Sequence, residues 1–410
     1  MRRPLRILNH HIFYPPEAVG VAAYAGQMCE WLAGQGHQVR VICPPPYYPY
    51  WAVQQPYKSW RYGSEILRGV HVTRCPIWIP SQPRGITRAL YAASFALSSF
   101  PALIREMFRR PDVIFVTEPS FLNTVASLAA AKCCGALSWM HVQDFELDIA
   151  FDMGQFRSGW PRRIVRVIES FVMRRFDVVS TISGRMMERL AAKGVDERRC
   201  VFFPNWVDTA AIFPMDEPSP LRRELEIPDD AVVTLYSGSM GAKQGIEQII
   251  DAARLLADHT KIRIVICGDG ASLPKLRATA KDLPNVRFLP LQAPERLNVL
   301  LNLADVHVLP QKPSVADLVM PSKLIGMLAS GRPVVATAQG GSEVAAVVRQ
   351  CGLVVPPENP PALAAALAAL SEDREWRAAL GAQARAYASR NFQREVILAE
   401  FELKLCSASA

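Results

Sequence analysis

The chain has 410 residues, which is too long for one ordinary domain and suits two domains of about 200 residues each. Half of the residues are hydrophobic, and the nine cysteines show neither a C-x-x-C pair nor a Cys/His spacing typical of metal ligands. We therefore expect two domains with sizeable cores, buried reduced thiols, a cytoplasmic location and no metal site.

Positive charge is concentrated in residues 1–205, which hold 25 Lys and Arg against 15 Asp and Glu, whereas the whole chain holds 46 against 38. This imbalance predicts an anionic partner for the N-terminal half, either lipid headgroups or nucleic acid. If the proteins of the source organism are basic in general, the same charge would arise without any anionic partner.

Strand-length apolar runs alternate with helical patterns along the whole chain, which predicts a parallel α/β architecture. The first half begins with a strand, LRILN, directly after MRRP, so we expect no signal peptide. A glycine-containing turn, a helix over residues 21–35 and a strand VRVIC come next. The later predicted strands of this half are DVIFVTE, GALSWMHV, DVVSTIS and CVFFPN.

An uncharged segment, ALYAASFALSSFPALI (residues 89–104), has arginines on both sides. It is shorter than the roughly 20 apolar residues of a membrane span, and we expect Pro101 to interrupt it. A buried crossover helix and an interfacial helix with basic flanks both fit the pattern, and a transmembrane helix fits less well.

The second half repeats the α/β pattern after a stretch rich in Pro and Asp at residues 203–220, which we interpret as a hinge. Its predicted strands are VVTLYSG, KIRIVICGDG, NVRFLP, DVHVLPQ and RPVVATA. We predict two Rossmann-like, doubly wound parallel-sheet domains, over residues 1–205 and 206–390, with a C-terminal helix at 391–410 packing back toward the first.

A glycine-rich turn, SGSMGAKQG, follows the first strand of the second half and contains Lys243. Its spacing fits neither a Walker A loop nor G-x-G-x-x-G. A strand, a glycine turn and a helix start with one lysine nevertheless suit a pyrophosphate, because helix N-terminal N–H groups and a cation both attract anions. The alternative is that the glycines only form the turn.

A second candidate site is MPSKLIGMLASGRPVVATA, where Pro321 can start a helix, Ser322 can cap it and Lys323 lies in the first turn. A lysine there opposes the helix dipole, so an anion would relieve the conflict. Simple capping with a solvated lysine is the other explanation.

Polar residues also follow two strands of the first half. A Pro-rich turn leads to Gly20, and WMHVQDFELD places His141 and Asp144 just after a strand. Ligands bind at such strand ends in doubly wound sheets, and a histidine with carboxylates suits acid–base or hydroxyl-binding work. A lone histidine there would more often be structural.

These stretches, taken with FYPPEAVGVAAYAGQMCEWLAGQGHQVRVIC, FFPNWVD and CGDG, resemble the retaining, nucleotide-sugar-dependent glycosyltransferases of family 4, which have the GT-B fold. The resemblance spans nearly the whole chain and is strongest to the WcaI group of exopolysaccharide biosynthesis. It implies transfer of a sugar, with GDP-fucose as a candidate donor, to a polyprenyl-pyrophosphate-linked acceptor at the inner face of the plasma membrane. It implies no nucleic acid partner, no metal and no cofactor beyond the nucleotide-sugar.

The resemblance also assigns roles to individual residues. The implied catalytic residues are His141, Asp144 and Lys243. The implied donor-binding residues are Gly20, Gly238, Ser239, Lys243, Gly268, Asp269, Gly270, Asp317, Ser322 and Lys323. Either His141 or Asp144 can be the residue that touches the sugar.

One departure from the family pattern concerns two glutamates, eight residues apart, that bind the sugar and the ribose. They fall on Leu318 and Gly326, and Asp317 is the nearest substitute for the first. Either another group, such as the Ser322 hydroxyl or backbone amides, holds the ribose, or Gly326 makes room for a different placement of the nucleotide. We expect the second. A nucleotide-sugar 2-epimerase of the same fold and a non-catalytic membrane-surface scaffold are the alternative functions.

Overall fold

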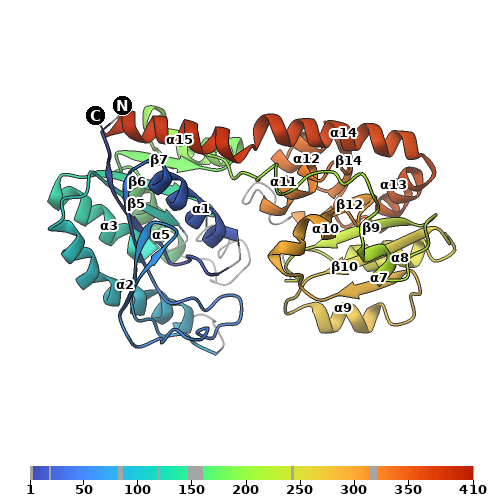
Figure 1. Cartoon of the computed structure of the whole chain (residues 1–410), viewed down its shortest axis with the longest axis horizontal. Helices are drawn as coiled ribbons and strands as arrows, with labels where there is room; N and C mark the ends of the chain where they lie inside the picture. Colours follow the sequence, from blue (N-terminus) through green and yellow to red (C-terminus); the bar gives the residue numbers. More distant parts are fainter. Residues whose placement is uncertain are drawn as a thin grey trace. The chain divides into compact units, whose positions relative to one another are not determined.

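The computed structural model describes residues 3–17, 20–81, 86–118, 121–145, 160–241, 244–313 and 321–409 (Figure 1). The chain forms two compact units, unit 1 with residues 1–204 and 397–410, and unit 2 with residues 205–396. The last turns of the C-terminal helix therefore belong to unit 1.

Within the described residues, unit 1 is built on an eight-stranded sheet in the order β3-β4-β2-β1-β5-β6-β7-β8. All neighbouring strands pair parallel except β3 and β4, which pair antiparallel. The strands are β1 Arg6–His10, β2 Gln38–Cys43, β3 Gly63–Leu67, β4 Val70–Arg74, β5 Val113–Glu118, β6 Leu137–Val142, β7 Val178–Thr181 and β8 Cys200–Phe202.

Helices cover both faces of this sheet. They are α1 Gly20–Gly34, α2 Ile86–Met107, α3 Phe121–Cys134, α5 Trp160–Met173, α6 Gly184–Ala192 and α15 Arg394–Ala408. On one face, Leu8 and Ile114 pack with Phe95 of α2 and Ala131 of α3. On the other face, the Phe401 ring of α15 packs edge-on against Phe115 and Trp139.

Within the described residues, unit 2 is built on a six-stranded, all-parallel sheet in the order β11-β10-β9-β12-β13-β14. The strands are β9 Val232–Ser237, β10 Ile262–Cys267, β11 Val286–Leu289, β12 Val306–Pro310, β13 Val334–Thr337 and β14 Gly352–Val355. The helices are α7 Leu221–Glu224, α8 Glu247–Leu255, α9 Leu273–Thr279, α10 Leu297–Leu301, α11 Ser322–Ala329, α12 Glu343–Val348, α13 Pro360–Glu372 and α14 Arg374–Asn391.

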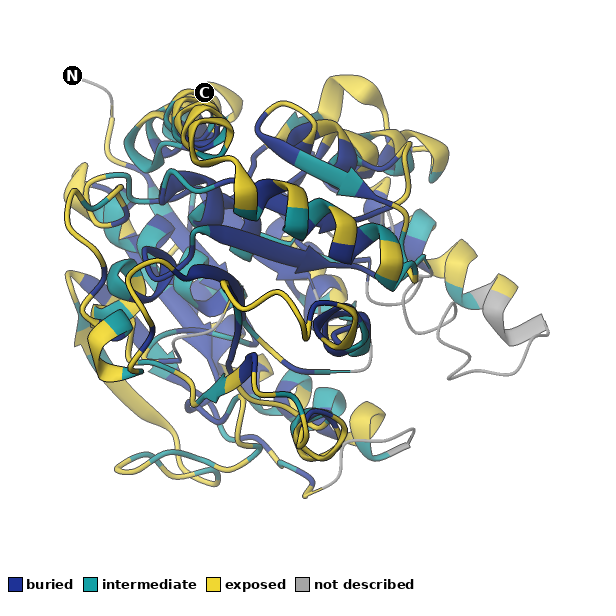
Figure 2. Ribbon diagram, turned by 90° about the vertical axis from the view of Figure 1, so that its right-hand side faces the viewer, coloured by how far each residue is buried: buried dark blue, intermediate teal, exposed yellow. Residues whose placement is uncertain are grey.

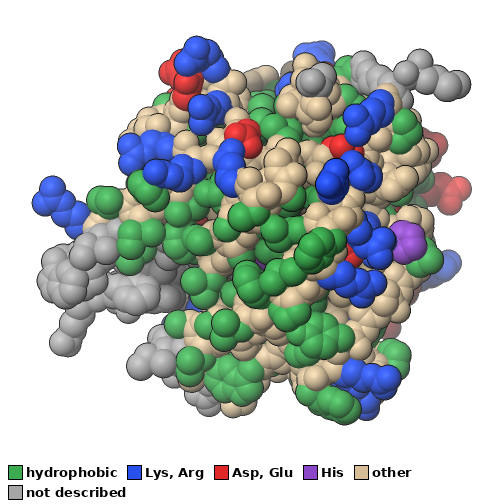
Figure 3. Space-filling view, turned by 90° about the vertical axis from the view of Figure 1, so that its left-hand side faces the viewer, with side chains coloured by type: hydrophobic (Ala, Val, Ile, Leu, Met, Phe, Trp, Pro, Cys, Tyr) green, Lys and Arg blue, Asp and Glu red, His purple; other side chains and the backbone are tan. Residues whose placement is uncertain are grey.

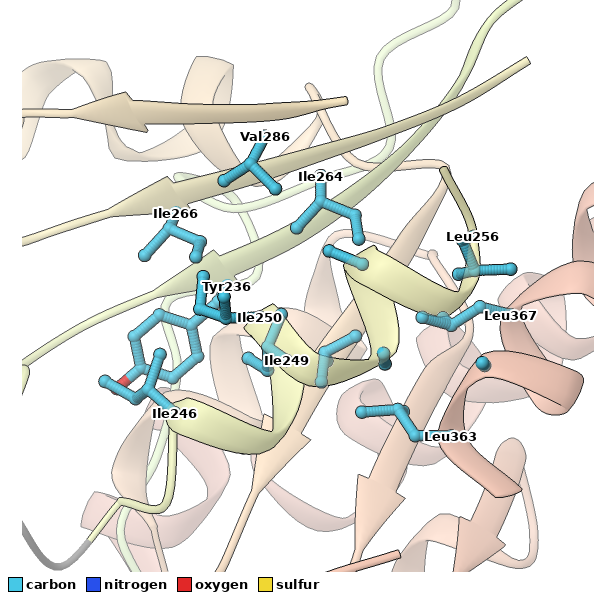
Figure 4. Packing of buried hydrophobic residues seen from close by; sticks show 14 of the residues in the cluster. Tyr236, Ile246, Ile249, Ile250, Leu256, Ile264, Ile266, Val286, Leu363 and Leu367 are labelled. Carbon is cyan, nitrogen blue, oxygen red and sulfur yellow. The ribbon is translucent and has the colours of Figure 1, made fainter. Parts of the chain in front are cut away.

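The central strands β9, β12 and β13 of unit 2 are buried because helices lie over both faces, whereas the outer sides of these helices are exposed (Figure 2). Figure 4 shows one face, where Ile249 and Ile250 of α8 and Leu363 of α13 pack on Ile264 and Ile266 of β10. The opposite face is covered by α7 and α10. Apolar runs of β9 and β10 are thus continuous because both of their faces are covered.

The structure corrects the sequence expectation for Pro101. Pro101 does not interrupt the apolar segment, because α2 continues through it. Pro101 itself is exposed, and the carbonyl that it leaves without a helical donor is that of Leu97, whose side chain is exposed too. None of the described helices, α2 included, combines the length and apolar character that crossing a membrane requires.

Candidate active site

Two glycine turns at the carboxyl ends of β9 and β10 are joined backbone to backbone. The Gly238 N–H donates to the Cys267 carbonyl at 3.0 Å, and the Met240 N–H donates to the Asp269 carbonyl at 2.8 Å. The φ angles of Gly238, Gly268 and Gly270 are all positive, in a region that other residues rarely adopt. The glycines are therefore required to hold these two loops together at the edge of the sheet.

Lys323 lies beside the first of these turns. It comes from the first turn of α11, and its Nζ donates to the Tyr236 hydroxyl at 3.0 Å. The same Nζ lies 4.1 Å from the centroid of the Tyr236 ring. A Cβ built on Gly238 would lie 3.4 Å from Lys323 Nζ, so the ammonium group directly faces the turn.

The charge of Lys323 is held in an apolar setting. Burial lowers the pKa of Lys323 from 10.5 to about 7. Among the described residues, no carboxylate forms an ion pair with it, and its partners are the hydroxyl and the ring of Tyr236. A buried lysine without a counter-ion at a glycine turn is a site prepared for an anion.

The N-terminus of α11 lies at the same place, and its N-cap residue contributes no side-chain bond. The structure corrects the expectation for Ser322 here. Pro321 is the N-cap residue and makes no side-chain cap bond, and Ser322 is the first residue of the helix. Within the part of the chain that the structure describes, the N–H groups of the first turn of α11 thus have no side-chain acceptor, which favours a bound anion as well.

The remaining donor-site residues of unit 2 differ in exposure. Gly268 is buried, whereas Ser239, Asp269 and Gly270 are exposed at the loop surface. Asp269 is partly engaged, because its Oδ1 accepts the Gly270 N–H at 2.7 Å. Lys243 and Asp317, which we predicted for catalysis and donor binding, lie outside the described residues.

Gly326 does not open onto empty space. Within the described residues, the atom that lies within 4 Å of a Cβ built on Gly326 is Leu301 Cδ1 of α10, at 3.4 Å. A side chain at this position would therefore point toward α10 of unit 2. This weighs against our expectation that the glycine makes room for the nucleotide.

In unit 1, His141 lies at the carboxyl end of β6 with both ring nitrogens engaged. Its Nδ1 is 2.9 Å from Ser180 Oγ, and its Nε2 is 2.9 Å from the Gln143 amide nitrogen. An amide nitrogen only donates, so Nε2 accepts and Nδ1 carries the proton. Burial lowers the pKa of His141 to about 3, which keeps the ring neutral. Asp144 is half-buried in the loop that follows.

His11 is a functional candidate that the sequence reasoning missed. It follows β1 and is 1% exposed, and neither ring nitrogen has a hydrogen-bond partner among the described residues. Its pKa is lowered to about 3 by burial, with smaller contributions from His10 and His141. The signal in the sequence was the run of three polar residues, NHH, at the end of an apolar strand.

A second missed residue is Glu17, in the turn that precedes Gly20. It is 3% exposed, and its Oε1 accepts the N–H groups of Tyr47 at 2.7 Å and Tyr48 at 2.8 Å. Burial raises the pKa of Glu17 to about 7, although the two N–H groups and Arg74 oppose the shift. Gly20 is exposed at the first position of α1, with a positive φ and open space around it.

The described residues contain no group of three or more His, Cys, Asp or Glu side chains that could hold a metal ion. None of the nine cysteines, all of them among the described residues, forms a disulfide, and five of them are buried. The polar groups gather instead at the carboxyl ends of the strands in each unit, which is where doubly wound sheets bind ligands.

Two Rossmann-like units, the second with glycine turns and a lysine arranged for an anion, define an enzyme of the GT-B class. Residues 19–206 match the family described as "Glycosyl transferase 4-like domain", and residues 219–387 match "Glycosyl transferases group 1". Over 97% of its length the chain is 37% identical to the putative colanic acid biosynthesis glycosyl transferase WcaI of Escherichia coli K12, and it covers 98% of that protein. The chain therefore belongs to glycosyltransferase family 4 and is a glycosyltransferase that uses nucleotide-sugar donors.

Solved structures share this fold at low sequence identity. Sucrose-phosphate synthase from Thermosynechococcus elongatus matches with a TM-score of 0.77 and 18% identity over 98% of both chains. Anabaena HepE, solved in complex with UDP, matches with a TM-score of 0.70 and 16% identity over 98% of this chain and 100% of its own. The predicted GT-B fold is confirmed.

Proposed function

We propose that this enzyme transfers a sugar, with retention of the anomeric configuration, from a nucleotide-sugar to a polyprenyl-pyrophosphate-linked acceptor in exopolysaccharide assembly. The similarity to WcaI, whose name refers to colanic acid biosynthesis, supports this class of product. GDP-fucose is the first donor to test. The residue roles follow from the family resemblance, with Lys243, His141 and Asp144 as catalytic residues and no metal.

The observation that carries the proposal is Lys323 against the Gly238 turn. In the reaction, the bond between the anomeric carbon and the diphosphate oxygen breaks, and the acceptor hydroxyl oxygen bonds to that carbon. The hydroxyl proton leaves to the diphosphate or to solvent. Negative charge develops on the leaving diphosphate, so cations and free N–H groups placed there lower the barrier. Lys323 and the start of α11 supply both.

We further propose that α2 docks unit 1 on an anionic membrane. Exposed apolar side chains recur on one side of this helix at spacings of three, four and seven residues, which places them on one stripe. They are Leu90, Leu97, Phe100 and Ile104 of α2, together with Phe108 in the turn directly after it. Leu97 is 76% and Phe108 is 85% exposed, so the stripe is not covered by the protein.

The charges around this stripe suit anionic lipid. Arg105 and Arg109 are exposed beside it. Glu106, the one acidic residue of α2, is buried and pairs with Arg40 at 2.7 Å and with Arg109 at 3.3 Å, so two arginines face one carboxylate. Figure 3 views the unit 1 side of the molecule, where hydrophobic side chains gather with Lys and Arg around them. Tyr62 and Trp78 are half-exposed next to α2, and such aromatic side chains favour the headgroup level of a bilayer.

The decisive experiment is to incubate the protein with radiolabelled nucleotide-sugars, GDP-fucose first, and a membrane lipid extract. Label that moves into the lipid fraction supports the proposal. Label that stays on the nucleotide-sugar in an isomerised form would support an epimerase instead. Unchanged donor with every nucleotide-sugar would favour the scaffold and contradict the proposal.

A further inference from the structure

Tyr236 connects Lys323 to the glycine turn on which the donor site is built. Its hydroxyl accepts from Lys323 Nζ at 3.0 Å and donates to the Ser239 carbonyl at 2.6 Å. The ring is fully buried in the core of unit 2 beneath α8, next to Ile246 (Figure 4). A buried ring with its hydroxyl bonded on both sides is a rigid support, so it fixes where the ammonium group of Lys323 lies.

Among the described residues, no acidic side chain compensates the charge of Lys323. Tyr236 is neutral, because burial raises its pKa further above its usual range. The charged residues of the adjacent described loops are Asp269 and Lys312, and neither pairs with Lys323. The apolar setting disfavours the charged ammonium, whereas a diphosphate next to it would favour it.

We propose that Tyr236 is a positioning residue that holds Lys323 against the Gly238 turn, and that Lys323 takes up a proton from solvent when the donor diphosphate binds. The inference rests on the proposed donor site and adds how that site responds to its ligand. The free enzyme holds a largely neutral amine above about pH 7, and the bound diphosphate converts it to an ammonium. Donor binding and protonation are therefore linked, and each favours the other.

The linkage gives a pH dependence with a definite sign. Above the pKa of free Lys323, binding requires one proton, so affinity falls by up to about tenfold per pH unit. Below that pKa the lysine is already charged, and affinity no longer depends on this proton. An arginine stays charged throughout, so it removes the dependence while it keeps a cation.

The test measures binding of GDP and UDP by isothermal titration calorimetry between about pH 7.5 and pH 8.5, in two buffers with different ionisation enthalpies. For the wild type we expect uptake of up to one proton per bound nucleotide and weaker binding at the higher pH. Lys323→Met should weaken binding by roughly 10- to 100-fold and abolish the uptake. Lys323→Arg should bind without uptake.

Tyr236→Phe keeps the ring in the core and removes only the hydroxyl. It should weaken binding several-fold and shift the steep part of the pH curve to lower pH, because the ammonium loses its acceptor. If Tyr236 had only a structural role, the steep part of the pH curve would not shift. Lys281→Met, an exposed lysine before β11, and Tyr387→Phe on α14 are matched controls that should behave like the wild type.

The outcomes distinguish the inference about Lys323 and Tyr236 from the proposed donor site. If the wild type binds GDP or UDP with proton uptake and Lys323→Met does the same, the inference about Lys323 is wrong and the donor site stands. Unaltered pH dependence in Tyr236→Phe would remove Tyr236 from its positioning role. Failure of the wild type to bind any nucleoside diphosphate would overturn the proposed donor site, and this inference with it.

Discussion

Gly268 packs directly against the backbone of Gly238. A Cβ built on Gly268 would stand 1.9 Å from the Gly238 carbonyl oxygen, and the φ angle of Gly268 is +142°. The contacting atoms of both loops are backbone atoms, so neither loop can shift as easily as a flexible side chain. This contact fixes the two donor-site loops against each other.

Gly268→Ala should therefore destabilise the protein by more than about 4 kcal/mol, or prevent folding, because it combines a backbone clash with an unfavourable φ. Urea unfolding followed by circular dichroism measures the change. Gly34→Ala is the matched control, since a Cβ at Gly34 meets nothing within 4 Å and should change stability little. Equal behaviour of the two variants would contradict the close packing of the loops.

Gly326→Ala should stabilise the protein by up to about 1 kcal/mol, because alanine favours a helix interior more than glycine does. The added methyl group meets Leu301 Cδ1 at 3.4 Å, and this flexible end can shift slightly. We expect the donor KM to stay unchanged. A sharply raised KM in a folded variant would instead show that the nucleotide occupies the space beside Gly326.

Glu17→Gln should change how stability depends on pH. The folded-state pKa of Glu17, about 7, lies above its ordinary value of 4.5, so the folded protein binds the extra proton between these pH values. The wild type thus loses stability as pH rises through this window, by up to roughly 3 kcal/mol. Glutamine keeps the oxygen that accepts from Tyr47 and Tyr48 and does not titrate.

The variant should consequently gain stability relative to the wild type between about pH 5 and pH 8, as measured by urea unfolding. Glu372→Gln, at an exposed position of α13, should show no such gain. Parallel pH curves for wild type and Glu17→Gln would mean that Glu17 does not titrate in this range.

Lys323→Met should raise the melting temperature of the ligand-free protein near neutral pH. The folded pKa of Lys323, about 7, lies below its ordinary 10.5, so the unfolded chain binds the extra proton between these values. The stability contribution of this lysine therefore rises with pH from about 7 to about 10.5. The difference in melting temperature between Lys323→Met and the wild type should therefore shrink over the same pH interval. A difference that grows with pH would contradict the assignment of Lys323 as a buried lysine without a described counter-ion.

Leu97→Asp and Phe108→Asp should each weaken binding to vesicles of phosphatidylcholine with about a quarter phosphatidylglycerol at least tenfold, because each removes an apolar contact and adds a repelled charge. Co-sedimentation measures the bound fraction. About 1 M salt should release much of the wild type, since the Debye length falls to about 3 Å.

Leu255→Asp is the control for this surface, because Leu255 is a similarly exposed leucine on α8 of unit 2. It should bind vesicles like the wild type. If all three aspartate variants bind equally well, α2 is not the docking face.

The sequence alone determined the regular part of this protein. Continuous apolar runs with helical patterns between them predicted most strands of both sheets, because strands covered on both faces need no polar alternation. The β3–β4 pair escaped this reasoning, since GSEIL and VHVTR are short and largely polar. The glycine turns were visible because a close approach of backbones admits no other residue.

Tertiary structure decided the environment of each polar group. Tyr236 and Lys323 are 87 residues apart in the sequence. No local pattern indicates that the Tyr236 hydroxyl accepts a hydrogen bond from the Lys323 ammonium group. The parallel register places Thr117 beside His141 and continues the row to Ser180, so the hydrogen-bond partner of His141 Nδ1 comes from a neighbouring strand. Charge, burial and hydrogen-bond partners depend on which strands become neighbours, and that depends on long-range packing that no local pattern encodes.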